Sequence, residues 1–117
     1  MDLALSHDLT VPVGAHRMGT TGVHVAIPEG HVGMLFVRSS TGIKRNLVLS
    51  NGTGIIDQGF RGQIKLSLHN TGDTTQHIQA GDYIAQLVVT PTHNHDICEV
   101  PALQHTQRGI NAIGSSN

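Results

Sequence analysis

The sequence predicts an all-β domain with almost no helix. Short segments alternate apolar and polar residues, and turn residues separate them about every eight to twelve positions, which is typical of a β sandwich or barrel. The only aromatic residues are Phe36, Phe60 and Tyr83, so the core must be built from Val, Ile, Leu and Ala. A chain of 117 residues predicts one small domain with a single core, which association with other copies would stabilise.

The first half of the chain predicts two strands and one short helix. Gly22 to Ile27 has the composition of a strand, and Pro28 to Gly30 predicts the turn that closes it. Val32 to Val37 predicts the second strand. Ser39 to Lys44 predicts one helical turn or slightly more, with a hydroxyl group as its N-cap.

The second half predicts a half-buried strand and a further strand pair. Ile64, Leu66 and Leu68 alternate with polar residues, which indicates one buried face and one wet face. Two more segments, 77–79 and 83–90, flank a predicted turn at 80–82.

The domain organisation is simple, because no internal repeat or linker is visible. Residues 1–106 predict one β domain. Residues 107–117 are rich in glycine and serine and predict a mobile tail.

Composition excludes several classes of partner and location. The formal net charge is −1 with seven basic residues, so no electrostatic footprint for nucleic acid or an anionic membrane is present. Cys98 is the single cysteine, which excludes an intrachain disulfide and fits a reducing compartment. No apolar run reaches membrane-spanning length, and the first residues do not resemble a signal peptide. We therefore predict a soluble, cytoplasmic protein.

The stretch from Asn51 to Ile64 is the most informative part of the sequence. Four glycines surround a single carboxylate, Asp57, and Phe60 follows three residues later. This pattern predicts a hairpin whose backbone approaches a small ligand closely, with an acid to activate water and a ring to stack on a flat or furanose surface. The alternative is an ordinary hairpin in which Asp57 forms an Asx turn.

Five short blocks in one order resemble the trimeric dUTPase family, whose members split dUTP into dUMP and pyrophosphate. The resemblance covers nearly the whole sequence and implies a jelly-roll-like β subunit in a homotrimer, with three sites at subunit interfaces. The blocks, in chain order, are Asp2-Leu3, Val37 to Gly42, Asn51 to Ile64, Gly81 to Leu87, and Arg108 to Ser116.

The resemblance assigns phosphate binding to the second and fourth blocks. Arg38 would supply a planar fork for phosphate oxygens, and Ser39 and Ser40 would supply hydroxyl and backbone donors. Gln86 would contact a phosphate or a nearby water. The structural alternatives are a capped helix turn for the Arg-Ser-Ser block and a half-buried strand amide for Gln86.

The third block would hold the nucleoside and the general base. Asp57 is the only carboxylate within the glycine-rich segment, so we predict that it polarises the attacking water. By resemblance, Asn51 and the backbone from Gly54 to Ile56 would recognise the uracil edge. Phe60 stands where the family usually has Tyr, and its ring would pack on deoxyribose and exclude a 2′-hydroxyl. Its alternative role is that of a core residue.

The metal implied by the resemblance is Mg²⁺, held mostly by the three phosphates and by waters. Asp2 would reach a metal-bound water. In the tail, Arg108 would clamp the γ-phosphate, and Ile113 and Ser115 belong to the block that covers the substrate.

Two departures from the family pattern bear on activity. Members carry an opening strand before the first block, so the resemblance implies either a fragment of a longer product or a fold that closes without that strand. Ile113 stands where the family has a Phe that covers uracil. Loss of a stacked ring, at about 1–3 kcal/mol per base, predicts substrate affinity weakened by about ten- to a hundredfold.

Two rival functions remain open at this point. A dCTP deaminase shares the fold, but its pattern has a catalytic Glu where this chain has Ser67 and an Arg where it has Ile43. A non-catalytic member of the same fold would bind a nucleotide or a protein and regulate a process without releasing pyrophosphate.

The nine histidines raise the question of a metal site. His93 and His95, with Cys98 nearby, have a spacing that could share Zn²⁺ on an extended segment. No second ligand pair is recognisable in the sequence, and the pattern favours a solvated loop.

Overall fold

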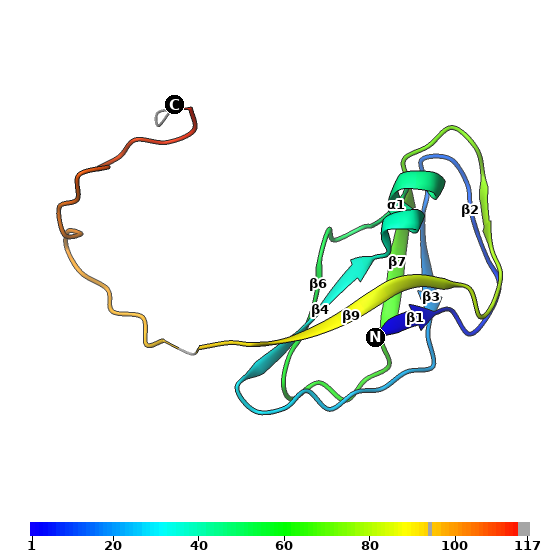
Figure 1. The fold of residues 1–117 in the computed structure, drawn as a ribbon, viewed down its shortest axis with the longest axis horizontal. Helices are drawn as coiled ribbons and strands as arrows, with labels where there is room; N and C mark the ends of the chain where they lie inside the picture. The colour runs from blue at the N-terminus through cyan, green and yellow to red at the C-terminus, as the bar shows by residue number, and fades with distance from the viewer. Residues whose placement is uncertain (94, 115–117) are drawn as a thin grey trace.

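The computed structural model describes residues 1–93 and 95–114. Within these residues the chain forms nine strands and one short helix (Figure 1). The elements are β1 (Asp2–Ala4), β2 (Leu9–Val11), β3 (His16–Thr20), β4 (His31–Val37), α1 (Ser39–Arg45), β5 (Leu47–Leu49), β6 (Gly54–Ile56), β7 (Lys65–Asn70), β8 (Gln76–Ile78) and β9 (Tyr83–Pro91).

Three antiparallel sheets make up the body. The largest has the strand order β1-β9-β4-β6, a second pairs β2 with β8, and the third has the order β3-β7-β5. Most neighbours within a sheet are distant in sequence, so the fold depends on non-local pairing. β9 and β4 form the longest ladder, from His31 opposite Pro91 to Val37 opposite Ala85. The predicted all-β class is confirmed.

An aliphatic core lies inside the body. Ile64, Leu66 and Leu68 are almost completely buried while Lys65 is exposed, which confirms the predicted alternation in β7. Phe60 and Tyr83 are exposed, so neither supplies the core. The predicted dependence on Val, Ile, Leu and Ala therefore holds.

Two of the predicted turns have the expected geometry. The His31 N–H donates to the Pro28 carbonyl oxygen at 3.1 Å, and Gly30 has φ +71°. Gly81 occupies the equivalent place in the turn before β9, with φ +89°. Glycine is required at both positions because other residues rarely adopt these dihedral angles.

The strand predictions are confirmed in part. β4, β7, β8 and β9 overlap the predicted segments within one or two residues. The predicted strand from Gly22 to Ile27 is wrong. The segment passes next to Ile64, whose N–H donates to the Val23 carbonyl oxygen at 2.9 Å, but no regular ladder forms there.

The predicted hairpin in the segment from Asn51 to Ile64 is also wrong. β6 does not pair with the residues that follow it but pairs with β4, with Gly33 opposite Ile56 and Leu35 opposite Gly54. A backbone hydrogen bond from Phe60 to Asp57, at 3.1 Å, closes a turn after β6. Sequence-local turn signals cannot reveal that a strand's partner lies about twenty residues upstream.

The predicted short helix is present as α1, but its predicted hydroxyl cap is wrong. Arg38 is the N-cap residue, and within the described structure its side chain makes no cap hydrogen bond. Asn46 ends the helix in the left-handed conformation, with φ 54°.

Beyond Thr92 the described residues run away from the body (Figure 1). The Thr92 N–H donates to the Gly30 carbonyl oxygen at 2.8 Å. The side chains of Ile97, Ile110 and Ile113 in this segment are fully exposed. None of the described helices has the length and apolar character needed to cross a membrane.

Candidate active site

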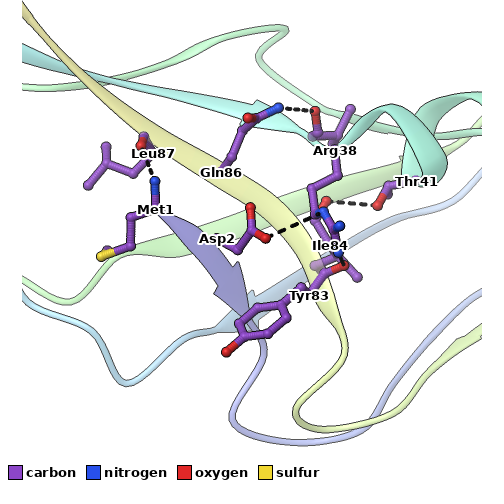
Figure 2. Close-up of polar contacts among 9 residues, drawn as sticks. Met1, Asp2, Arg38, Thr41, Tyr83, Ile84, Gln86 and Leu87 are labelled. Carbon is purple, nitrogen blue, oxygen red and sulfur yellow. Dashed lines mark hydrogen bonds and ion pairs between the residues drawn. The ribbon is translucent and has the colours of Figure 1, made fainter.

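Asp2, Arg38 and Gln86 lie together at one edge of the largest sheet (Figure 2). Asp2 on β1 is opposite Gln86 on β9, and Gln86 is also opposite Phe36 on β4. The Gln86 amide donates to the Val37 carbonyl oxygen at 3.5 Å. Three sequence blocks that are far apart along the chain therefore contribute side chains to one small surface.

The ion pair within this cluster is loose. The Arg38 Nε lies 3.8 Å from Asp2 Oδ2, and the two side chains are 39% and 46% exposed. Pairs of this kind typically contribute about 0–1 kcal/mol to stability. Arg38 also donates from Nη1 to the Tyr83 carbonyl oxygen at 3.1 Å. A guanidinium has five N–H donors, so this arrangement orients Arg38 without exhausting its capacity to bind an anion.

The junction between β4 and α1 positions Arg38. The Arg38 N–H donates to the Ile84 carbonyl oxygen at 3.0 Å, and the buried Thr41 hydroxyl donates to the same oxygen at 2.8 Å. Ser39 and Ser40 lie in the first turn of α1 with exposed side chains. Hydrogen bonds to the Ile84 carbonyl oxygen therefore hold the Arg-Ser-Ser block against β9, and its polar groups face solvent.

A cavity of about 510 Å³ brings together four other predicted residues, Asn51, Gly54, Ile56 and Phe60. Its remaining lining is Met18, Leu35, Ile55, Gly62, Gln63, Ile64 and Lys65. This volume lies within the range of small-molecule sites, and a mostly apolar lining with a few polar groups is typical of them. β6 is an edge strand, so its backbone can offer hydrogen-bonding groups to a bound ligand.

Asp57 lies outside both of these groups. It directly follows β6, is exposed, and lines a separate polar hollow of about 390 Å³ with His31 and Thr92. In a single chain, therefore, the predicted general base does not share a cavity with Phe60 or lie in the Arg38 cluster.

The tail residues also lie apart from the body. Arg108 donates from Nε to the Asn111 carbonyl oxygen at 2.9 Å, and Ile113 is fully exposed. Ser115 falls outside the described residues. His93 and His95 have rings 5.9 Å apart and tilted, and the described part of the chain contains no cluster of three or more potential ligands arranged for a metal.

Several cavity residues were missed by sequence reasoning. Gln63 and Lys65 alternate with buried Ile64, and that alternation, continued back from β7, could have indicated that they face outward beside Phe60. Met18 and Leu35 come from β3 and β4 and carry no local signal. Only the pairing of distant strands brings them to the cavity.

Comparison with known proteins agrees with this arrangement. The family model described as dUTPase matches residues 1–117. The deoxyuridine 5'-triphosphate nucleotidohydrolase of Tropheryma whipplei (strain Twist) is 39% identical over 117 residues, covering 98% of this chain and 80% of the relative. The enzyme of the same name from Escherichia phage T5 is 43% identical over 106 residues, covering 88% of this chain and 70% of the relative.

The fold comparison gives the same result. The G164S mutant of the Staphylococcus bacteriophage 80alpha dUTPase, solved with dUpNHpp, superposes with a TM-score of 0.91 at 26% identity. That match covers 98% of this chain and 83% of the phage protein. Since the family model spans the whole sequence and close relatives match it nearly end to end, this chain belongs to the dUTPase family.

Proposed function

We propose that this protein hydrolyses dUTP to dUMP and pyrophosphate with the help of Mg²⁺. One observation supports the proposal: in a chain of the dUTPase family, the residues that the resemblance assigns to the phosphates and those that it assigns to the nucleoside lie in two separate groups on the surface. The first surface is the cluster of Asp2, Arg38 and Gln86. The second is the cavity beside β6.

The cavity beside β6 suits a deoxyuridine. Uracil presents an acceptor, a donor and an acceptor along one edge, and backbone groups of an edge strand can pair with such an edge much as a partner strand would. Asn51 adds a side-chain amide at the same cavity. The Phe60 ring, 43% exposed, offers an apolar surface on which the sugar packs and against which a 2′-hydroxyl would clash.

The cluster around Arg38 suits the triphosphate. A guanidinium binds phosphate oxygens through two parallel hydrogen bonds, and the Ser39 and Ser40 hydroxyls are exposed beside it. Gln86, which is opposite Asp2 in the sheet, would orient a phosphate oxygen or a water. These groups neutralise and hold charge, so that water can attack at the α-phosphorus.

The residues present also fit a substrate-bound Mg²⁺. This ion usually keeps several waters and takes one or two carboxylates together with substrate phosphates. Asp2 supplies one half-exposed carboxylate beside the phosphate-binding guanidinium. When bound, Mg²⁺ would neutralise charge on the phosphates. Asp57 acts as the general base, accepting a proton from the attacking water.

Arg38 and Asp57 require more than one copy of the chain to act on one substrate. Arg38 follows one end of β4, whereas Asp57 lies beyond Ile56, which pairs with Gly33 near the other end. About six residue steps of roughly 3.3 Å therefore separate them, or roughly 20 Å. A triphosphate bound by Arg38 of one copy would meet Asp57 of another.

The outer face of the largest sheet offers a contact for that second copy. Val88, Met34 and Ile55 form one row across β9, β4 and β6. Val88 and Ile55 are 42% and 55% exposed, while their neighbours Leu87 and Ile56 face the core. An exposed apolar row on a small domain favours association, and we propose the homotrimer implied by the resemblance.

The test is an assay of pyrophosphate release from dUTP, dCTP, dTTP and UTP, with and without a chelator. We expect release from dUTP alone. Asp57→Asn keeps the size of the side chain but removes the base, so kcat should fall by about 10²- to 10⁴-fold while dUTP binding persists. Equal turnover by Asp57→Asn would overturn the assignment of the base.

The same assay separates the alternative functions. Ammonia released from dCTP would identify a deaminase. Nucleotide binding without any pyrophosphate release would identify a regulatory module. The presence of Ile113 in place of an aromatic residue favours this alternative.

A further inference from the structure

The far end of the Phe60 ring lies in the space that a side chain at position 62 would occupy. A Cβ atom placed on Gly62 would come within 2.5 Å of the Phe60 Cζ, 2.8 Å of Cε2 and 3.3 Å of Cε1. Separations under 3.0 Å are too short for non-bonded carbon atoms. The absence of a side chain at position 62 is therefore what allows the ring its present position.

The backbone that carries this ring is held separately. The Phe60 N–H donates to the Asp57 carbonyl oxygen at 3.1 Å. The Arg61 Nη1 donates to the Gln58 and Phe60 carbonyl oxygens, both at 3.1 Å. Because these bonds hold the turn, the remaining freedom of Phe60 is rotation of its side chain, and Gly62 provides the surface against which it comes to rest.

Both residues line the cavity beside β6. Since Phe60 is 43% exposed, the ring has room to rotate away from position 62. A ring displaced in that way would no longer stand where the sugar of a bound nucleotide meets it.

We propose that Gly62 is a positioning residue that determines the discrimination between deoxyribose and ribose, acting through the Phe60 ring. The proposal rests on the proposed function for the class of substrate. It adds a cause: the ring excludes a 2′-hydroxyl only while the missing side chain at Gly62 leaves room for the far end of the ring.

The effect of Gly62→Ala should be local. The atoms that an alanine at 62 would meet are at the far end of the Phe60 side chain, which can swing aside. Gly54 differs, since a Cβ there would come within 2.9 Å of the Leu35 Cβ, which is fixed in the core. Gly62→Ala should therefore fold with nearly unchanged thermal stability.

The experiment compares binding of dUMP and UMP, and kcat/KM for dUTP and UTP, in four proteins: unaltered, Gly62→Ala, Phe60→Ala and the double variant. We expect Gly62→Ala to lower the preference for the deoxynucleotide by about tenfold. Phe60→Ala should lower it similarly, and the double variant should show no further loss, because both changes remove the same contact. Gly59→Ala is the matched control: a Cβ there meets no atom within 4 Å, so the preference should persist.

Three results would overturn the inference. The first is an unchanged preference for the deoxynucleotide in folded Gly62→Ala, and the second is a double variant in which the two losses of preference add. The third is failure of both Gly62→Ala and the double variant to fold, which would mean that Gly62 is needed for the fold. Failure of the proposed function is distinguishable. If the unaltered protein prefers dUMP over UMP but does not hydrolyse dUTP, the proposed reaction is refuted, and the role of Gly62 can still be tested by nucleotide binding. If the unaltered protein binds dUMP and UMP equally, the role of Gly62 is refuted.

Discussion

At the scale of single residues, the side chains of the candidate site are exposed while the groups that orient them are buried. Arg38 is an example, since its side chain faces solvent, whereas its backbone N–H is bonded to Ile84 inside the sheet. Such an arrangement keeps the guanidinium available to a ligand and reduces the conformational entropy lost on binding. The loose Asp2 partner adds orientation more than stability.

Ile113 allows a prediction in which activity is gained. Its side chain is fully exposed in the described structure, so an aromatic ring there should not disturb the folded body. If this position covers the uracil, Ile113→Phe should add stacking of about 1–3 kcal/mol and lower the KM for dUTP by about ten- to a hundredfold. Steady-state kinetics measures this change.

Ile110 supplies the control for that gain. It lies three residues earlier and is equally exposed, so Ile110→Phe adds the same hydrophobic ring at a position with no predicted contact to uracil. An equal fall in KM for both variants would mean that the tail binds substrate through nonspecific apolar contact.

At the scale of elements, the junction between β4 and α1 connects the core to the Arg-Ser-Ser block, which is proposed to bind phosphate. The Thr41 hydroxyl, on the first turn of α1, is bonded to β9 through the Ile84 carbonyl oxygen. Thr41 is 1% exposed, so this bond is shielded from water. The helix is short, and its orientation therefore depends on this contact more than on intrinsic helix propensity.

Thr41→Val tests that dependence. Valine nearly preserves the volume but removes the hydroxyl, and the Ile84 carbonyl oxygen keeps the Arg38 N–H as a donor. The free energy of unfolding should fall by about 1 kcal/mol, and the KM for dUTP should rise because Arg38 is less well oriented. Denaturant unfolding and kinetics measure the two effects. Thr41→Ser retains the hydroxyl and should keep the KM, and a similar rise in Thr41→Ser would contradict this account.

At the scale of the whole molecule, the proposed roles of Arg38 and Asp57 predict a site shared between chains, because the two residues lie far apart within one chain. Mixing Arg38→Ala and Asp57→Asn proteins, unfolded and refolded together, should restore about a quarter of the activity of the unaltered protein. Half of the copies retain Arg38 and the other half retain Asp57. If copies assemble at random, about a quarter of the shared sites receive both intact residues.

An inactive refolded mixture would contradict the shared site. If each chain carried a complete site, the mixture would remain inactive. Mixing Arg38→Ala with the Arg38→Ala, Asp57→Asn double variant gives the control, since no copy then has Arg38 and no activity should return. Light scattering on the unaltered protein should give the mass of three chains.

Most of the prediction from sequence succeeded where the signal was local. The alternation of Ile64, Leu66 and Leu68 with polar residues predicted β7 correctly. Turns were predicted correctly at Gly30 and Gly81, which adopt dihedral angles that other residues rarely adopt. The prediction failed where pairing decided the outcome. Gly22 to Ile27 has strand composition but no regular ladder, and β6 pairs with β4 instead of with the residues after Asp57.

The sequence by itself determined the fold class, the family and the chemical types of the candidate site residues, because alternation, turn glycines and ordered motifs are properties of short segments. Only the tertiary structure decided which of those residues lie together. Asp2, Arg38 and Gln86 meet because β1, β9 and β4 are adjacent, and Asp57 is separated from them because it follows an edge strand that runs antiparallel to β4. Strand pairing joins positions that are distant along the chain through backbone hydrogen bonds common to every residue, so the side-chain pattern of any one segment cannot specify its partner.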